Sequence, residues 1–162
     1  MSHGRPPRVV RYTHNLNMMT RVVLRVTRLT TDEFDDVVAP IRASLAAMRE
    51  GVASELQWSI LASACELALA IEDKGITSGM RGHLRTGESI LASIRLRAMS
   101  TGAWVPVAPD LHEIDDLNWM INLHEHQLGV VSSGEAKAAL NLATGRVRSD
   151  GGRVLQLAKA YV

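Results

Sequence analysis

The chain of 162 residues has the usual length of one domain built around one hydrophobic core. A hydrophobic fraction of 46% and a charged fraction of 22% are typical of globular proteins and exclude disorder along the whole chain. The formal net charge is +1, and no run approaches the roughly 18 uninterrupted apolar residues of a membrane span, which excludes a membrane protein.

The first 29 residues are predicted to form a basic segment. Six arginines and no acidic residue fall between Met1 and Thr31, namely Arg5, Arg8, Arg11, Arg21, Arg25 and Arg28. The stretch from Asp32 to Lys74 reverses this balance, with nine acids against three bases. Alternating apolar residues predict an edge strand over 21–29, which could pair with 8–14 as a hairpin. The basic segment could bind nucleic acid, or it could equally pack against the protein's own acidic surface.

Four pairs of residues predict where helices begin. In each pair a Ser, Thr or Asp is followed three residues later by Glu or Gln, and each side chain can bond the other residue's backbone N–H in a capping box. The pairs are Thr30 with Glu33, Ser54 with Gln57, Asp110 with Glu113, and Ser132 with Glu135. Glycines are expected to end the helices, because a glycine closes the last turn in the left-handed conformation without strain. They are Gly51, Gly75, Gly102, Gly129 and Gly145.

These signals predict a mainly α fold with a helical domain over 30–145. The basic segment, residues 1–29, precedes this domain, and a C-terminal tail, residues 146–162, follows it. The expected helices are Thr31–Glu50, Ser54–Lys74, Ser78–Ser100, Asp110–Leu128 and Ser133–Thr144.

Proline and glycine place irregularities in two of these helices. Pro40 should kink the first helix or open a second piece, because it removes a backbone donor and clashes with the preceding turn. Gly79, Gly82 and Gly87 weaken the third helix by up to about 1 kcal/mol each relative to alanine. Its first part should therefore be irregular or admit a close neighbouring backbone.

The helix over 54–74 is apolar on nearly every side. One stripe consists of Leu56, Ile60, Ala64, Leu67 and Ile71, and a second stripe consists of Trp58, Leu61, Cys65, Ala68 and Leu69. Only the strip with Glu55, Ser59, Glu66 and Asp73 should face water. We expect this helix to be central and covered by at least two others, for which the third and fourth helices have suitable stripes.

Three histidines on the fourth helix do not form a metal site. His112 and Asp116 are one turn apart on one face, whereas His124 and His126 are two residues apart and point in nearly opposite directions. The segment also lacks the second histidine of the zinc-protease motif. We predict no metal and no cofactor, with His112, Asp116 and His126 on the surface. His124 should border the apolar stripe and have a hydrogen-bond partner.

No other catalytic or phosphate-binding motif is found. Cys65 lies on an apolar stripe, where burial would keep its side chain a protonated thiol. The presence of a single cysteine, together with the lack of a secretion signal, favours a location in the cytoplasm. The spacing of Gly129 and Gly134 resembles a nucleotide loop, but Glu135 and Ala136 stand where lysine and a hydroxyl residue are required.

Tryptophans provide candidates for partner binding. Trp119 shares with His112 and Leu123 a face of the fourth helix away from its main stripe, and such a tryptophan can anchor a partner or a second protomer. It could instead pack under the connection that contains Trp104. Trp58 would join the contact surface if its stripe of the central helix is exposed.

We therefore expect a non-enzymatic helical protein of adaptor or inhibitor type that binds a protein partner and self-associates as a homodimer. The alternative is a regulator that binds nucleic acid through the six arginines of the basic segment, with Arg81 and Arg85 adding positive charge on the third helix. An enzyme is least favoured, although catalytic groups that only the fold brings together are invisible in one sequence.

Overall fold

The computed structural model describes residues 28–149, which form five α-helices and no strand within that range. The helices are α2 (Thr31–Arg49), α3 (Glu55–Asp73), α4 (Arg81–Ala98), α5 (Leu111–Val130) and α6 (Ser133–Ser149). The prediction of a mainly α fold with five helices is therefore confirmed. The predicted N-terminal hairpin, over 8–29, falls almost wholly outside the described residues, as does the tail from 150 onwards.

The capping boxes form as predicted. Thr30, Ser54 and Asp110 each accept a backbone N–H bond from the residue three places on, whose side chain bonds back to the cap. Before α6, the Ser132 N–H donates to Glu135 at 2.8 Å, and the Glu135 N–H donates to the Ser132 hydroxyl at 3.4 Å.

The predicted helix ends are correct only in part. Gly51, Gly75 and Gly102 have φ values of +71°, +71° and +85°, as expected for glycines that follow a helix. Gly129 and Gly145 instead lie inside α5 and α6, so the ends predicted there are wrong.

Tertiary contacts explain why these two helices continue. Val131 is buried directly after α5, and its N–H still makes the helical bond to the Gln127 carbonyl at 3.0 Å, so the helix continues through Gly129 to this buried anchor. Beyond Gly145, Arg146 is held on α6 by an ion pair with Asp73 of α3. A glycine inside a helix costs about 1 kcal/mol, which such contacts can exceed.

Two further boundaries differ from expectation. Helix α4 begins at Arg81 rather than Ser78, because Gly79 adopts a φ of +86° that interrupts the helix. Pro40 opens no second piece, since α2 is one continuous helix across it. The Ser44 hydroxyl donates to the Pro40 carbonyl at 2.7 Å in the next turn.

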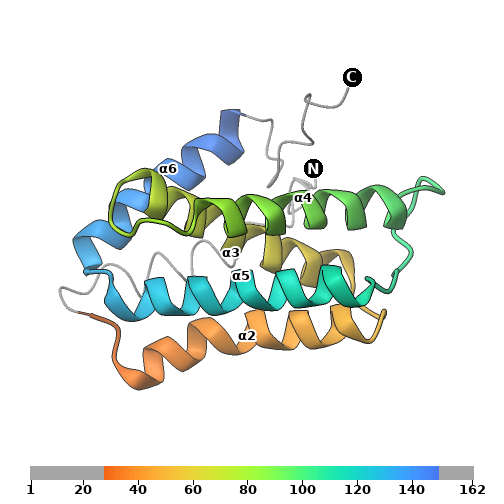
Figure 1. Cartoon of the computed structure of the whole chain (residues 1–162), viewed down its shortest axis with the longest axis horizontal. Coiled ribbons are helices and arrows are strands. Elements are labelled where there is room, and N and C mark those ends of the chain that lie inside the picture. The colour runs from red at the N-terminus through yellow and green to blue at the C-terminus, as the bar shows by residue number, and fades with distance from the viewer. Residues whose placement is uncertain (1–27, 150–162) are drawn as a thin grey trace, which may run out of the picture.

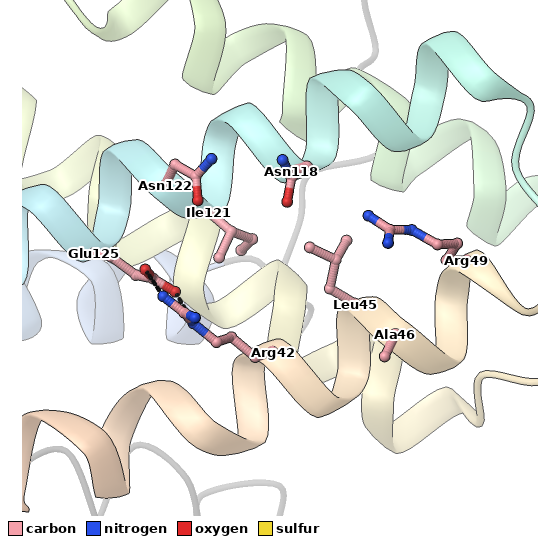
Figure 2. Close-up of a pocket in the computed structure, with 8 residues that line it drawn as sticks. All are labelled: Arg42, Leu45, Ala46, Arg49, Asn118, Ile121, Asn122 and Glu125. Carbon is pink, nitrogen blue, oxygen red and sulfur yellow. Dashed lines mark hydrogen bonds and ion pairs between the residues drawn. The ribbon is translucent and has the colours of Figure 1, made fainter.

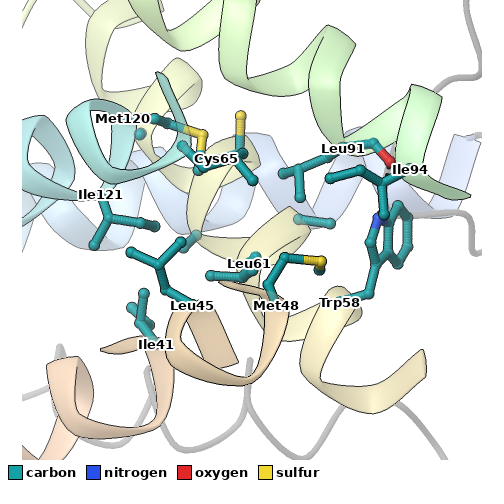
Figure 3. Close-up of a cluster of buried hydrophobic side chains, with 14 of the residues drawn as sticks. Ile41, Leu45, Met48, Trp58, Leu61, Cys65, Leu91, Ile94, Met120 and Ile121 are labelled. Atoms are coloured by element: carbon teal, nitrogen blue, oxygen red, sulfur yellow. Dashed lines mark hydrogen bonds between the residues drawn. The ribbon is translucent and has the colours of Figure 1, made fainter. Parts of the chain in front are cut away.

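Helix α3 is the centre of the fold. It contacts all four of the other described helices, which confirms the prediction that at least two helices cover it. Figure 1 shows α5 between α2 and α4, with α3 behind them and α6 at one end. In Figure 3, side chains from α2, α3, α4 and α5 meet in one core, among them Leu45, Leu61, Leu91 and Ile121.

Two residues of α3 differ from the prediction in their exposure to solvent. Leu56, placed in an apolar stripe, is 57% exposed, whereas Glu66, placed in the wet strip, is buried. Leu56 is in the first turn of the helix, and Glu66 is in its middle, where the neighbours surround it. Position along the helix, and not only angle around it, decides burial here.

Trp58 joins α3 to α4. Its indole N–H donates to the Leu91 carbonyl at 2.9 Å, and the Arg95 guanidinium lies 5.1 Å from the centre of its ring. Trp104, in the connection after α4, packs on Trp58 with ring centroids 6.2 Å apart and donates to the Ala53 carbonyl. The indoles therefore close the end of the core where α3 begins.

Gly87 lets α4 and α5 approach closely. A Cβ atom at this position would lie 2.4 Å from the Met120 sulfur and 2.9 Å from its Cγ atom. Met120 is fully buried, so its side chain has little room to move. The close approach that the sequence suggested for these glycines occurs at Gly87, where a side chain rather than a backbone fills the space.

We expect Gly87→Ala to lower the free energy of unfolding by about 1–3 kcal/mol, because overpacking outweighs the better helix propensity of alanine. Urea unfolding followed by circular dichroism measures this change. Gly82→Ala, on the same helix, is the matched control, since its Cβ would meet no atom within 4 Å and stability should not fall. An unchanged stability of Gly87→Ala would show that Met120 moves aside.

Candidate functional site

Three of the four residues predicted for partner binding lie along α5. Trp119 is 48% exposed, His112 is exposed, and Leu123 is partly buried against the core. Trp58 is buried, so its stripe of α3 offers no surface to a partner in the folded chain.

Trp119 does not pack beneath the connection that contains Trp104. Its ring meets the edge of His83 of α4 instead, with centroids 5.8 Å apart and an interplanar angle of 79°. The ring of Trp104 packs on the ring of Trp58. Half of the Trp119 indole is left open to solvent at the junction of α4 and α5.

A groove runs along this junction and has a volume of about 520 Å³. We call it the α4–α5 groove, and it is lined by Arg85, Thr86, Ser89, Ile90, Ser93, Asp110, His112, Glu113 and Asp116. His83 and Trp119 lie three residues from Thr86 and Asp116 on their respective helices, so the aromatic pair continues the groove by one helical turn. His112 and Trp119 are thus brought to one continuous surface.

The α4–α5 groove has a negative balance of charge. Arg85 pairs with Glu88 at 2.6 Å, and Glu113 pairs with Arg97 at 2.7 Å. The hydrogen bond and the charge of Arg97 hold the pKa of Glu113 below its ordinary value, against the effect of burial. Neither Asp110 nor Asp116 has an ion-pair partner among residues 28–149, although the Asp110 carboxylate caps α5 and its charge also acts on Arg97.

The arginines proposed for nucleic-acid contact are only partly described. Arg5, Arg8, Arg11, Arg21 and Arg25 lie outside the described residues. Arg28 is exposed, whereas Arg81 and Arg85 form ion pairs with Asp73 and Glu88. The two arginines of α4 therefore add little free positive charge to the described surface.

A second groove, the α2–α5 groove, lies on the other flank of α5. Its volume is about 210 Å³, and its lining consists of Arg42, Leu45, Ala46, Arg49, Asn118, Ile121, Asn122 and Glu125 (Figure 2). None of these residues was selected from the sequence as a site. The spacing of Asn118 and Asn122, and of Arg42 and Arg49, places each pair on one helical face, but only the fold brings the two faces together.

A chain of buried polar groups connects α5 to α3 and α4. The Gln127 amide donates to the Ala68 carbonyl at 3.1 Å and to the Thr77 hydroxyl at 3.0 Å, and Thr77 donates to Glu72 at 2.9 Å. The Glu72 carboxylate in turn accepts the N–H of Met80 at 2.8 Å. Because α4 has no capping side chain of its own, Glu72 of α3 provides its N-terminal cap.

His124 ends this chain inside the core. It is fully buried, and its Nδ1 atom lies 3.4 Å from the Gln127 Oε1 atom. The Gln127 nitrogen is directed at a carbonyl, so its oxygen faces His124 and the proton of the neutral ring belongs on Nδ1. Among residues 28–149, the Nε2 atom has no hydrogen-bond partner. The predicted hydrogen-bond partner of His124 is confirmed, and its ring is fully buried rather than at the border of the apolar stripe. The exposed positions of His112, Asp116 and His126 are also confirmed.

The Cys65 side chain is not a reactive nucleophile. The thiol is fully buried, and burial, followed by the charges of Glu88 and Glu66, raises its pKa well above the ordinary value. Between residues 28 and 149, no three His, Cys, Asp or Glu side chains are grouped to hold a metal ion. None of the helices in this part of the chain has the length and apolar character to cross a membrane.

Compared with family models, curated proteins and solved structures, the chain matches none of them.

Burial makes His124 a source of acid sensitivity. Desolvation lowers its pKa from 6.5 to about 4 in the folded protein. Protonation is therefore easier in the unfolded chain, so stability is full above pH 6.5 and falls as the pH drops towards 4. The loss attributable to this residue should be about 3 kcal/mol.

We expect His124→Gln to remove most of this pH dependence, even if the variant is less stable at neutral pH. Urea unfolding at about pH 7.5 and about pH 4.5 measures the difference for each protein. The exposed His126→Gln is the matched control and should keep the wild-type slope. The same slope in all three proteins would contradict the assignment.

Proposed function

We propose that this chain is a non-enzymatic helical interaction protein, of adaptor or inhibitor type, that self-associates through the α4–α5 groove. The observation that carries the proposal is the half-exposed indole of Trp119 at the end of that groove. An accessible tryptophan beside a groove is suited to anchoring a partner, because it buries a large apolar area with little loss of side-chain entropy.

Charge supports a second copy of the chain as the occupant. Asp110 and Asp116 leave the groove negative, whereas residues 1–31 contain six arginines and no acid. Guanidinium groups of one copy can pair with these carboxylates and stack on the Trp119 ring of another. The formal net charge of +1 leaves little overall repulsion between copies.

The groove residues also suit binding better than catalysis. The hydroxyl groups of the groove come from Thr86, Ser89 and Ser93 on α4. Its Arg85 and Glu113 side chains are each engaged in an ion pair. These groups can form hydrogen bonds to a peptide at the rim, while the exposed ring supplies the apolar contact. The proposed contact is therefore a tryptophan anchor within a polar, acidic rim.

Light scattering on size-separated protein tests the proposal. Over about 1–100 μM the wild-type chain should pass from monomer to dimer, and Trp119→Ala should raise the dissociation constant at least about tenfold. Asp116→Asn should weaken association more at low salt than at high salt, because it removes one charge pair.

Leu56→Ala is the matched control. Leu56 is 57% exposed but lies on α3 and does not line the groove, so this variant should associate as the wild type does. A wild-type chain that stays monomeric at every concentration would overturn self-association. A dimer that is unaffected by Trp119→Ala would overturn the assignment of the surface.

A further inference from the structure

The α2–α5 groove differs chemically from the α4–α5 groove. Helix α5 separates the two (Figure 1), so the α2–α5 groove is open to a different ligand. Its charged residues are Arg42, Arg49 and Glu125, which give it an excess of one positive charge.

That positive charge resides on Arg49. Arg42 donates from Nε to Glu125 at 2.7 Å and also from Nη2, so the pair is bidentate. The hydrogen bond and the charge of Glu125 raise the pKa of Arg42, and the charges of these two side chains neutralise each other. Arg49 follows seven residues later on the same face of α2, and its guanidinium has no hydrogen bond or ion pair with any residue of 28–149. Figure 2 shows its guanidinium extending over the groove.

The opposite wall of the groove offers uncommitted amides. Asn118 and Asn122 stand one turn apart on α5 and are both exposed, and their side-chain amides make no hydrogen bond with residues 28–149. A primary amide has two donors and one carbonyl, which match the C=O and N–H of a peptide group. Leu45 and Ile121 lie between the two walls and provide an apolar floor (Figure 2).

We propose that the α2–α5 groove binds an acidic side chain of a partner protein, with Arg49 pairing the carboxylate and the two asparagines bonding the adjoining peptide groups. A guanidinium presents two parallel N–H groups that match a carboxylate. The groove has about 210 Å³ of space, whereas sites for whole small molecules usually begin near about 300 Å³. This space suits one side chain.

The charge of the groove favours a carboxylate over a phosphate. A carboxylate carries one negative charge, which the single free guanidinium neutralises, whereas a phosphate group carries about −1.5 to −2 near pH 7. Arg42 is already neutralised by Glu125, so the described lining residues supply no second free cation to balance the additional charge. The Arg42–Glu125 pair therefore selects a singly charged ligand and leaves Arg49 as its only charge partner.

Nuclear magnetic resonance of the labelled full chain tests this proposal, with N-acetyl-glutamate N-methylamide as the probe. The Arg49 Nε–H signal and the side-chain amides of Asn118 and Asn122 should shift and saturate. N-acetyl-glutamine N-methylamide, which has the same shape without the charge, should leave Arg49 unmoved. Equal shifts with both probes, or no saturable shift with the acidic probe, would overturn the proposal.

Two variants and one further ligand complete the test. Arg49→Gln should weaken binding of the acidic probe at least about tenfold. Its thermal unfolding should not change, because Arg49 is exposed and unpaired. Arg148→Gln, an exposed arginine of α6 outside the groove, should bind as the wild type does. Undiminished binding by Arg49→Gln, or saturation by inorganic phosphate at lower concentration than by the acidic probe, would overturn the carboxylate assignment.

Discussion

The burial of α3 on all sides is the constraint on which the rest of this structure depends. A helix with apolar residues around most of its circumference is stable in water only when neighbours remove that surface from solvent. Four helices, α2, α4, α5 and α6, do so, and three of them also contribute to the main core cluster. The positions of these four helices, and hence of both grooves, follow from this need.

Buried polar groups then determine how the surrounding helices are oriented. Gln127 ties α5 to the backbone of α3 through Ala68, and Glu72 of α3 caps the start of α4. Asp73 binds Arg81 of α4 and Arg146 of α6. Burial opposes ionisation of Asp73, but these two arginines outweigh it and hold its pKa below the ordinary value. Hydrophobic burial has little directionality, whereas each of these bonds requires one geometry.

Helix α5 has two unlike flanks as a result. Towards α4 it presents Trp119 and acidic side chains, and towards α2 it presents two asparagines opposite a free arginine. A protein with both surfaces could associate with its own copies on one side and hold an acidic segment of another protein on the other.

The sequence by itself determined where the four helices with capping boxes begin and which helix is central. Each capping box depends on two side chains three residues apart, so it can be recognised without knowledge of the fold. The apolar circumference of α3 likewise requires neighbours, whatever their identity. The partner of His124 was expected from its position beside the apolar stripe of α5, whereas its full burial was not.

Only the tertiary structure decided the features that depend on contacts distant in the sequence. Gly129 and Gly145 do not end their helices, because Val131 is buried beyond the first and Arg146 is bound to Asp73 beyond the second. Trp119 meets His83 of α4 rather than the connection with Trp104, because the packing of α4 on α5 brings together residues 36 positions apart in the sequence. The α2–α5 groove could not be foreseen, since Arg49 and Asn118 are 69 residues apart and only the packing of α2 on α5 brings them to one surface.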